Sequence, residues 1–108
     1  MTGDFKKFKE ALALPGLPLY HNEALGETGD YIVWGETSRL YTFAGSRAIH
    51  SGWRVAIDLF TREEYGAEAV IEAALSAIGI LVSDCQRIYE PETGYTHYAF
   101  TAEVWDIG

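Results

Sequence analysis

The stretch that decides the fold runs from Trp53 to Glu64 and reads WRVAIDLFTREE. Large apolar residues occupy every second position from Trp53 to Leu59, which predicts a strand with one buried face and Asp58 on the opposite face. After Thr61 the apolar residues recur at helical spacing as far as Ile78. A strand therefore leads directly into an amphipathic helix, and this junction sets the architecture.

Upstream, the residues from Thr2 to Leu14 predict a short helix. Phe5, Phe8 and Leu12 lie on one side of it at helical spacing, and charged residues occupy the other positions. The helix is expected to end at Pro15-Gly16, because proline cannot continue the hydrogen-bond ladder and glycine tolerates the turn.

The remaining segments predict strands on both sides of the main helix. Candidate strands cover residues 31–34 (continued raggedly to 38), 40–43, 53–60, 85–89 and 95–105, and residues 17–20 are a further short candidate outside this count. Glu63 or Glu64 starts the main helix and Gly79 ends it, while Arg39 to Trp53 is expected to form a hairpin that extends from the body. The order α-β-β-β-α-β-β favours one α+β domain over residues 1–108, with a mixed, mainly antiparallel sheet and two helices packed on one face.

Composition excludes several classes of function. The 108 residues include eight Lys and Arg against 16 Asp and Glu, a formal net charge of -8, which argues against binding nucleic-acid phosphates or anionic membranes. No apolar run approaches the length of a transmembrane helix. The single Cys85 has no partner for an intramolecular disulfide, so we expect assembly in a cytoplasm.

No pattern of metal ligands is present. His21, His50 and His97 lie far apart in the sequence, and Cys85 is not part of a CxxC pair. The sharpest metal hypothesis joins His21 to Glu23, but an ordinary polar loop is the favoured interpretation. We therefore predict no metal and no cofactor.

Two pairs of residues could carry chemistry. Cys85 and His97 could meet as a thiol–imidazole pair, and Asp58 with Glu103 could form a general acid/base pair. Neither pair has a local catalytic signature. We therefore expect a protein that is not an enzyme, and keep as the alternative a small-ligand-binding or enzymatic α+β domain with His97, Cys85 or Asp58 in a pocket between sheet and helix.

Two features indicate association with another chain. The main helix has a second side of small residues, at Gly66, Ala69, Ala73 and Ala77, although alanine is also simply a good helix former. The predicted strands carry aromatic residues on both faces, but two helices cover only one face of a sheet. The other face is therefore available to another subunit.

The chain resembles a known family in the order of its short structural motifs. These are Pro18-Leu19-Tyr20, the strand from Tyr31 to Glu36, the strand from Val55 to Thr61, the helix from Ala67 to the Gly79-Ile80 step, and the closing strand from Tyr95 to Trp105. In these segments the sequence resembles small tail-completion proteins of long-tailed phages and prophages, also called tail terminator or head–tail joining proteins. The resemblance covers nearly the whole chain, but none of its motifs is a chemical signature.

The resemblance implies a structural virion component that forms a ring, often hexameric, at the head-proximal end of the tail tube. Its partners would be other copies of itself, the tail tube protein and the head connector protein. The hairpin from Leu40 to Trp53 would be the arm that joins neighbouring subunits. Arg39, Arg47, Trp53 and Arg54 are then the candidate interface residues.

The resemblance also implies a role for the net negative charge. DNA would pass through the lumen of the ring, and a negative lining would repel its phosphates without any specific binding of nucleic acid. The densest acidic cluster in the sequence is Glu63, Glu64, Glu68 and Glu72. A solvated helix face is the ordinary explanation of that cluster.

Overall fold

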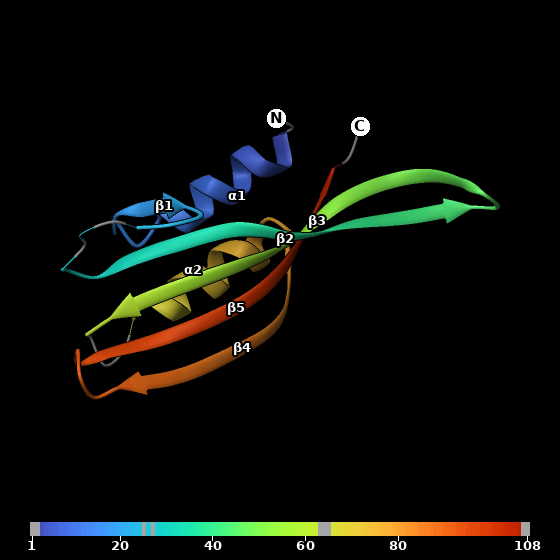
Figure 1. Ribbon diagram of the computed structural model, residues 1–108. Coiled ribbons are helices and arrows are strands. Elements are labelled where there is room, and N and C mark those ends of the chain that lie inside the picture. Colours follow the sequence, from blue (N-terminus) through green and yellow to red (C-terminus); the bar gives the residue numbers. More distant parts are fainter. Residues whose placement is uncertain (1–2, 25, 27, 63–65, 107–108) are drawn as a thin grey trace.

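The computed structural model describes residues 3–24, 26, 28–62 and 66–106. The described residues form two helices and five strands in the predicted order α-β-β-β-α-β-β (Figure 1). Their bounds are α1 Gly3–Ala13, β1 Leu19–His21, β2 Tyr31–Ala44, β3 Arg47–Thr61, α2 Ala67–Ala77, β4 Leu81–Glu90 and β5 Tyr95–Asp106. The main helix begins at Ala67, later than the predicted Glu63 or Glu64, because Gly66 before it has φ of 127°, which is outside the helical region. Glu63 and Glu64 themselves lie outside the described residues.

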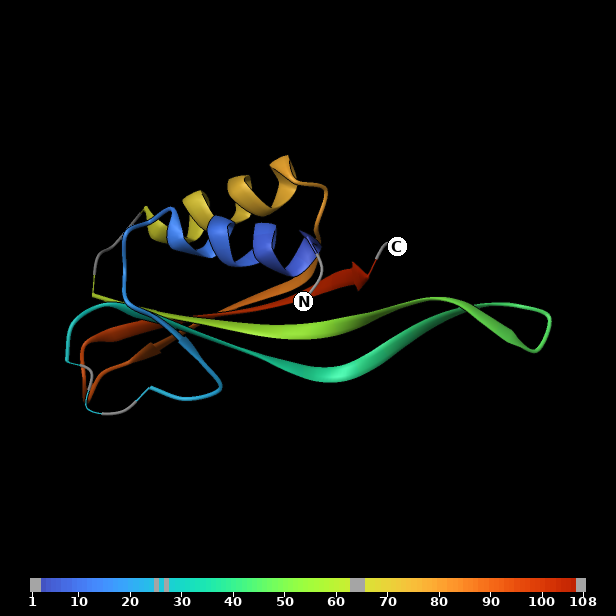
Figure 2. The ribbon, with the colours of Figure 1, turned by 90° about the horizontal axis from the view of Figure 1, so that it is seen from above.

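The strands form a single five-stranded sheet in the order β1-β2-β3-β5-β4. β1 runs parallel to β2, and every other neighbouring pair is antiparallel. Both helices lie on the same face of the sheet, as Figure 2 shows from above. The predicted α+β class, the mixed sheet and the one-sided placement of the helices are confirmed.

The alternation in β3 decides which face is covered. Val55, Ile57 and Leu59 are fully buried beneath the helices. From the helices, Phe8 and Leu12 of α1 and Ile71 and Leu75 of α2 complete this core and are also fully buried. Burial of each such side chain contributes about 1.5–3 kcal/mol, so this single layer between sheet and helices is the main source of stability.

The helices end where the sequence predicts. Gly16 and Gly79 both adopt positive φ, 76° and 77°, a conformation that side-chain-bearing residues rarely take. The apolar stripe of α2 is only partly covered, because Val70 and Ile78 remain exposed at its margins.

Hydrogen bonds from Thr61, the last residue of β3, and from Arg62 connect the loops at the end of the sheet opposite the hairpin. The Asp30 carboxylate accepts hydrogen bonds from Thr61 Oγ1 at 2.7 Å and from the Arg62 backbone N–H at 3.0 Å. The Arg62 guanidinium donates to the carbonyls of Thr28 and Thr93 and lies 3.9 Å from the centre of the Tyr95 ring. The decisive stretch of sequence therefore also fixes the loops at this end.

Both strands of the β2–β3 hairpin are longer than the sequence predicts, and β4 begins at Leu81 rather than near Cys85. Residues 31–34 and 40–43 belong to one strand, β2, since a register shift between Glu36 and Ser38 lets the ladder continue past Thr37. β3 begins at Arg47 rather than Trp53, because its first residues pair with the end of β2 although they lack alternation. Hydrogen bonding across the hairpin replaces the hydrophobic pattern as the cause of strand structure here.

The β2–β3 hairpin projects beyond the sheet, as predicted. β5 stops opposite Ser51, and every residue from Tyr41 to His50 is exposed. Figures 1 and 2 show this segment, called the arm below, pointing away from the helices and the other strands. The molecule measures 51 × 22 × 22 Å, and its radius of gyration of 14.9 Å exceeds the value of about 13 Å expected for a compact chain of this length.

Candidate functional site

The arm exposes large apolar side chains at positions where a strand could have carried polar ones. Tyr41, Phe43 and Ile49 are 53%, 61% and 52% exposed, and the Tyr41 and Phe43 rings lie 6.1 Å apart. Single exposed apolar residues are common on protein surfaces, but neighbouring ones on a projecting element are typical of an interaction surface.

Two of the predicted interface residues come together at the root of the arm. Arg39 donates a hydrogen bond from Nη2 to Ser51 Oγ at 2.8 Å, across the hairpin. Its guanidinium lies 4.6 Å from the centre of the Trp53 ring and 5.8 Å from that of Tyr41. Trp53 in turn packs against the core, so this cation–π contact links the arm to the body.

The arm and its root are positively charged within an acidic protein. The residues from Thr37 to Ile57 contain three of the eight Lys and Arg residues and none of the 16 Asp and Glu residues. Within the described part of the chain, none of Arg39, Arg47 and Arg54 forms an ion pair with a carboxylate. Three exposed guanidinium groups thus keep charges that no carboxylate of the described residues neutralises by direct contact. This segregation is visible in the sequence and could have been found there.

A close backbone approach fixes the arm to the body. A Cβ at Gly52 would lie 2.7 Å from the Val104 carbonyl oxygen and 2.9 Å from Trp105 Cα. These atoms lie near the end of the β3–β5 ladder, where Gly52 pairs with Trp105. Only glycine fits at this position without moving a neighbouring strand.

The face of the sheet opposite the helices carries a row of stacked rings. Tyr31 stacks on Phe60 at 4.8 Å, and Phe60 stacks on His97 at 4.3 Å. His97 Nε2 lies 2.7 Å from Asp58 Oδ1, within hydrogen-bond distance. The prediction that aromatic residues load both faces is confirmed, and sequence reasoning missed the pairing of His97 with Asp58.

The proposed catalytic pairs are not assembled. Cys85 is paired with Phe100, on the helix-covered face, whereas His97 lies on the opposite face, so the thiol–imidazole pair was wrong. Asp58 is opposite Ala99, four residues from Glu103 along β5, a separation of about 13 Å at strand spacing. The acid/base pair was therefore also wrong.

His21 pairs with Glu36 rather than with Glu23. The two side chains approach to 2.6 Å, and the imidazole stacks on Trp34 at 4.0 Å. The hydrogen bond from His21 holds the pKa of the Glu36 carboxyl below its usual range. No group of three or more metal-ligating side chains occurs among the described residues.

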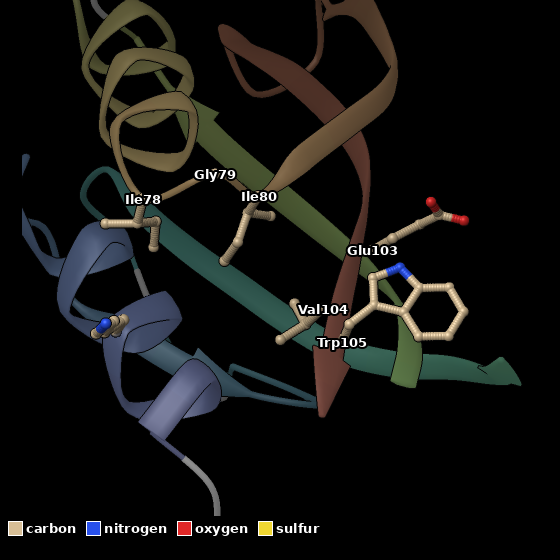
Figure 3. A pocket seen from close by; sticks show the side chains of 7 residues that line it. Ile78, Gly79, Ile80, Glu103, Val104 and Trp105 are labelled. Carbon is tan, nitrogen blue, oxygen red and sulfur yellow. The ribbon is translucent and has the colours of Figure 1, made fainter. Parts of the chain in front are cut away.

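A small cavity lies between the end of α2 and the end of β5 (Figure 3). It has a volume of about 130 Å³ and is lined by Lys7, Ile78, Gly79, Ile80, Glu103, Val104 and Trp105. Ligand pockets commonly measure about 300–1,000 Å³, so this cavity is too small for a typical cofactor or substrate. Of the three residues expected in a pocket between sheet and helix, His97 and Asp58 line neither this cavity nor the groove described next, whereas Cys85 lines that groove.

A larger and more open groove lies between α2 and β4. Its volume is about 470 Å³, and its lining consists of Glu72, Ser76, Ile80, Leu81, Val82, Ser83, Asp84 and Cys85. The pKa of the Cys85 thiol is raised, first by burial and then by the nearby carboxylates of Glu72, Asp84 and Glu68. The groove thus combines exposed apolar side chains with negative charge.

The acidic cluster of the main helix is only partly placed. Glu63 and Glu64 lie outside the described residues, while Glu68 and Glu72 belong to α2. Glu72 lines the groove and Glu68 lies close enough to affect Cys85, so both face the β4 side of the helix. Their predicted exposure to a lumen stays a prediction.

Among the described residues, no helix is both long and apolar enough to cross a membrane.

No protein-family model matches the sequence, and no curated protein matches it either. The fold has a counterpart among virion proteins. The chain is similar to a chain in a solved structure described as the virion of a native gene transfer agent (GTA) particle, with a TM-score of 0.57 and 15% sequence identity. The match covers 95% of this chain and 92% of that chain. At this identity the comparison establishes a shared fold over essentially the whole domain.

Proposed function

We propose that this protein is a structural component of a virion, which caps the head-proximal end of a tail tube and joins the tail to the head connector. The observation that carries the proposal is the combination of a fold shared with a virion chain and an exposed apolar arm that projects from it. Its partners are further copies of itself, the tail tube protein and the head connector protein. It acts in the virion after assembly in the cytoplasm of a bacterial host.

The shape of the molecule supports assembly into a ring. An arm that binds a different surface of the next subunit makes a heterologous contact, and repetition of such a contact by rotation closes a ring. Arg39, Arg47, Trp53 and Arg54 lie on or at the root of this arm. In the proposed ring, often a hexamer among proteins that this sequence resembles, they belong to the subunit interface.

The charge of the protein supports passage of DNA without binding. A net charge of -8 repels phosphates, so a ring of such subunits would leave DNA free to move through its lumen. The proposal contains no catalytic step, metal or cofactor. It rests on interfaces alone.

The test is assembly on a tail tube. Light scattering after size-exclusion chromatography gives the oligomeric state of the protein alone, and negative-stain images with tail tube protein show where it binds. We expect rings, or density confined to one end of each tube. Binding along the tube wall, or no binding to tubes at all, would refute the proposed function.

A further inference from the structure

We propose that the arm of one subunit docks in the groove between α2 and β4 of a second copy of this chain. The α2–β4 groove is the one lined by Glu72, Leu81, Asp84 and Cys85 together with their neighbours. This inference rests on the proposed function in one respect, namely that the protein assembles with itself. It adds the identity of the surface that receives the arm.

Apolar surface is the first point of complementarity. The arm presents Tyr41, Phe43 and Ile49, each more than half exposed. The groove offers Leu81, which is 60% exposed, beside the partly buried Ile80 and Val82. Contact between the two would remove apolar area from water on both sides, which is the main driving force of association.

Charge is the second point of complementarity. The arm and its root contribute three arginines and no acid, whereas the groove lining contains Glu72 and Asp84 and no Lys or Arg. The pKa of Cys85 is raised first by burial, and the carboxylates of Glu72 and Asp84 raise it further. A cationic arm fits this groove, while an acidic partner or a nucleic acid would be repelled by it.

The occupant must come from another chain. The arm points away from its own body along the 51 Å axis, and its own groove lies at the far edge strand of the sheet, beside β4 (Figures 1 and 2). Because the arm and the groove are different surfaces, each subunit can give one arm and receive another. That is the heterologous contact from which closed rings are built.

Cys85 allows a direct test, since it is the single cysteine of the chain and lines the groove. We would introduce a second thiol on the arm with Ser46→Cys or Ala48→Cys and oxidise the protein with diamide, which accepts the two hydrogens released as a disulfide forms. Glu92→Cys, in the exposed β4–β5 turn, is the control for random collision. We expect a ladder of covalent oligomers from at least one arm variant, absent from the Glu92→Cys control and abolished by Cys85→Ser.

Charge reversal provides an independent test. Arg47→Glu and Glu72→Arg should each weaken self-association at least about tenfold, as expected for loss of a close interfacial charge pair. The reversal Lys6→Glu, on the exposed side of α1, should not change it. Combining Arg47→Glu with Glu72→Arg in one chain should restore association, and a fold defect in either variant would appear in circular dichroism.

The outcomes separate the inference from the proposed function. The cross-linking is run with and without tail tube protein, so that assembly triggered by a partner is also detected. If tube ends are capped but neither arm variant cross-links to Cys85, the groove is not the acceptor and the proposed function stands. If cross-links form through Cys85 but tubes are ignored, the arm–groove contact stands and the proposed function is wrong.

Discussion

The same substitution at two phenylalanines should separate folding from assembly. Phe8 is fully buried, with its ring 6.1 Å from Phe5 and 5.4 Å from Trp34, both in edge-to-face geometry. Loss of its burial removes about 1.5–3 kcal/mol, and each aromatic contact adds about 0.5–1.5 kcal/mol. We therefore expect Phe8→Ala to lower the free energy of unfolding by about 3–5 kcal/mol. Phe43 is 61% exposed, so Phe43→Ala should change it by no more than about 0.5 kcal/mol.

The assay is urea unfolding followed by circular dichroism, at a protein concentration where light scattering shows monomers. This condition is needed because self-association stabilises the folded state by mass action and would hide the difference. Self-association of Phe43→Ala is then measured at higher concentration, where we expect it to be lost. A loss of more than about 1 kcal/mol for Phe43→Ala, or of less than about 1 kcal/mol for Phe8→Ala, would refute the assignment of the two residues to arm and core.

Three further predictions concern single sites. Gly52→Ala should destabilise the protein by about 1–3 kcal/mol, measured by thermal unfolding, because its Cβ would meet the backbone of β5; an unchanged unfolding midpoint would contradict this. The pKa of Glu36 is lowered by His21, so the ionised carboxylate should stabilise the fold fully at pH values above the usual glutamate range, and this stabilisation should be lost as pH falls through the folded-state pKa. Glu36→Gln should therefore reduce the fall in unfolding free energy at acidic pH, measured by urea unfolding at several pH values. An unchanged fall would count against the His21–Glu36 pair. The raised pKa of Cys85 should make its alkylation at neutral pH slower than that of a free thiol, and Glu72→Gln should speed it; equal rates in the two proteins would remove Glu72 as a cause.

The core residues could be predicted from the sequence, because burial of one face makes apolar residues recur at a regular spacing. The alternation from Val55 to Leu59 and the helical spacing of Phe5, Phe8 and Leu12 both follow from one covered face, and both are found buried. The projecting hairpin was also predicted, and Gly45 at its tip adopts a positive φ of 63°.

The positions of the candidate catalytic residues could not be predicted in the same way. A register shift between Val82 and Asp84 changes which side chains of β4 face the helices, and this places Cys85 opposite Phe100. A one-residue shift reverses every later side chain of a strand, and no hydrophobic period marks it in the mostly exposed β4. The pairing of His97 with Asp58 likewise depends on the register of two strands that are far apart in the sequence.

The bulge near the tip of the arm affects how readily unassembled subunits aggregate. An uncovered hairpin presents free backbone N–H and C=O groups, a template on which other strands can aggregate. Here the register shift between Thr42 and Phe43 interrupts that edge, and Arg47 adds a positive charge beside it. Short, irregular and charged edges pair poorly with one another. Newly made chains can therefore carry an uncovered arm at high concentration and still remain separate until the correct surface is met.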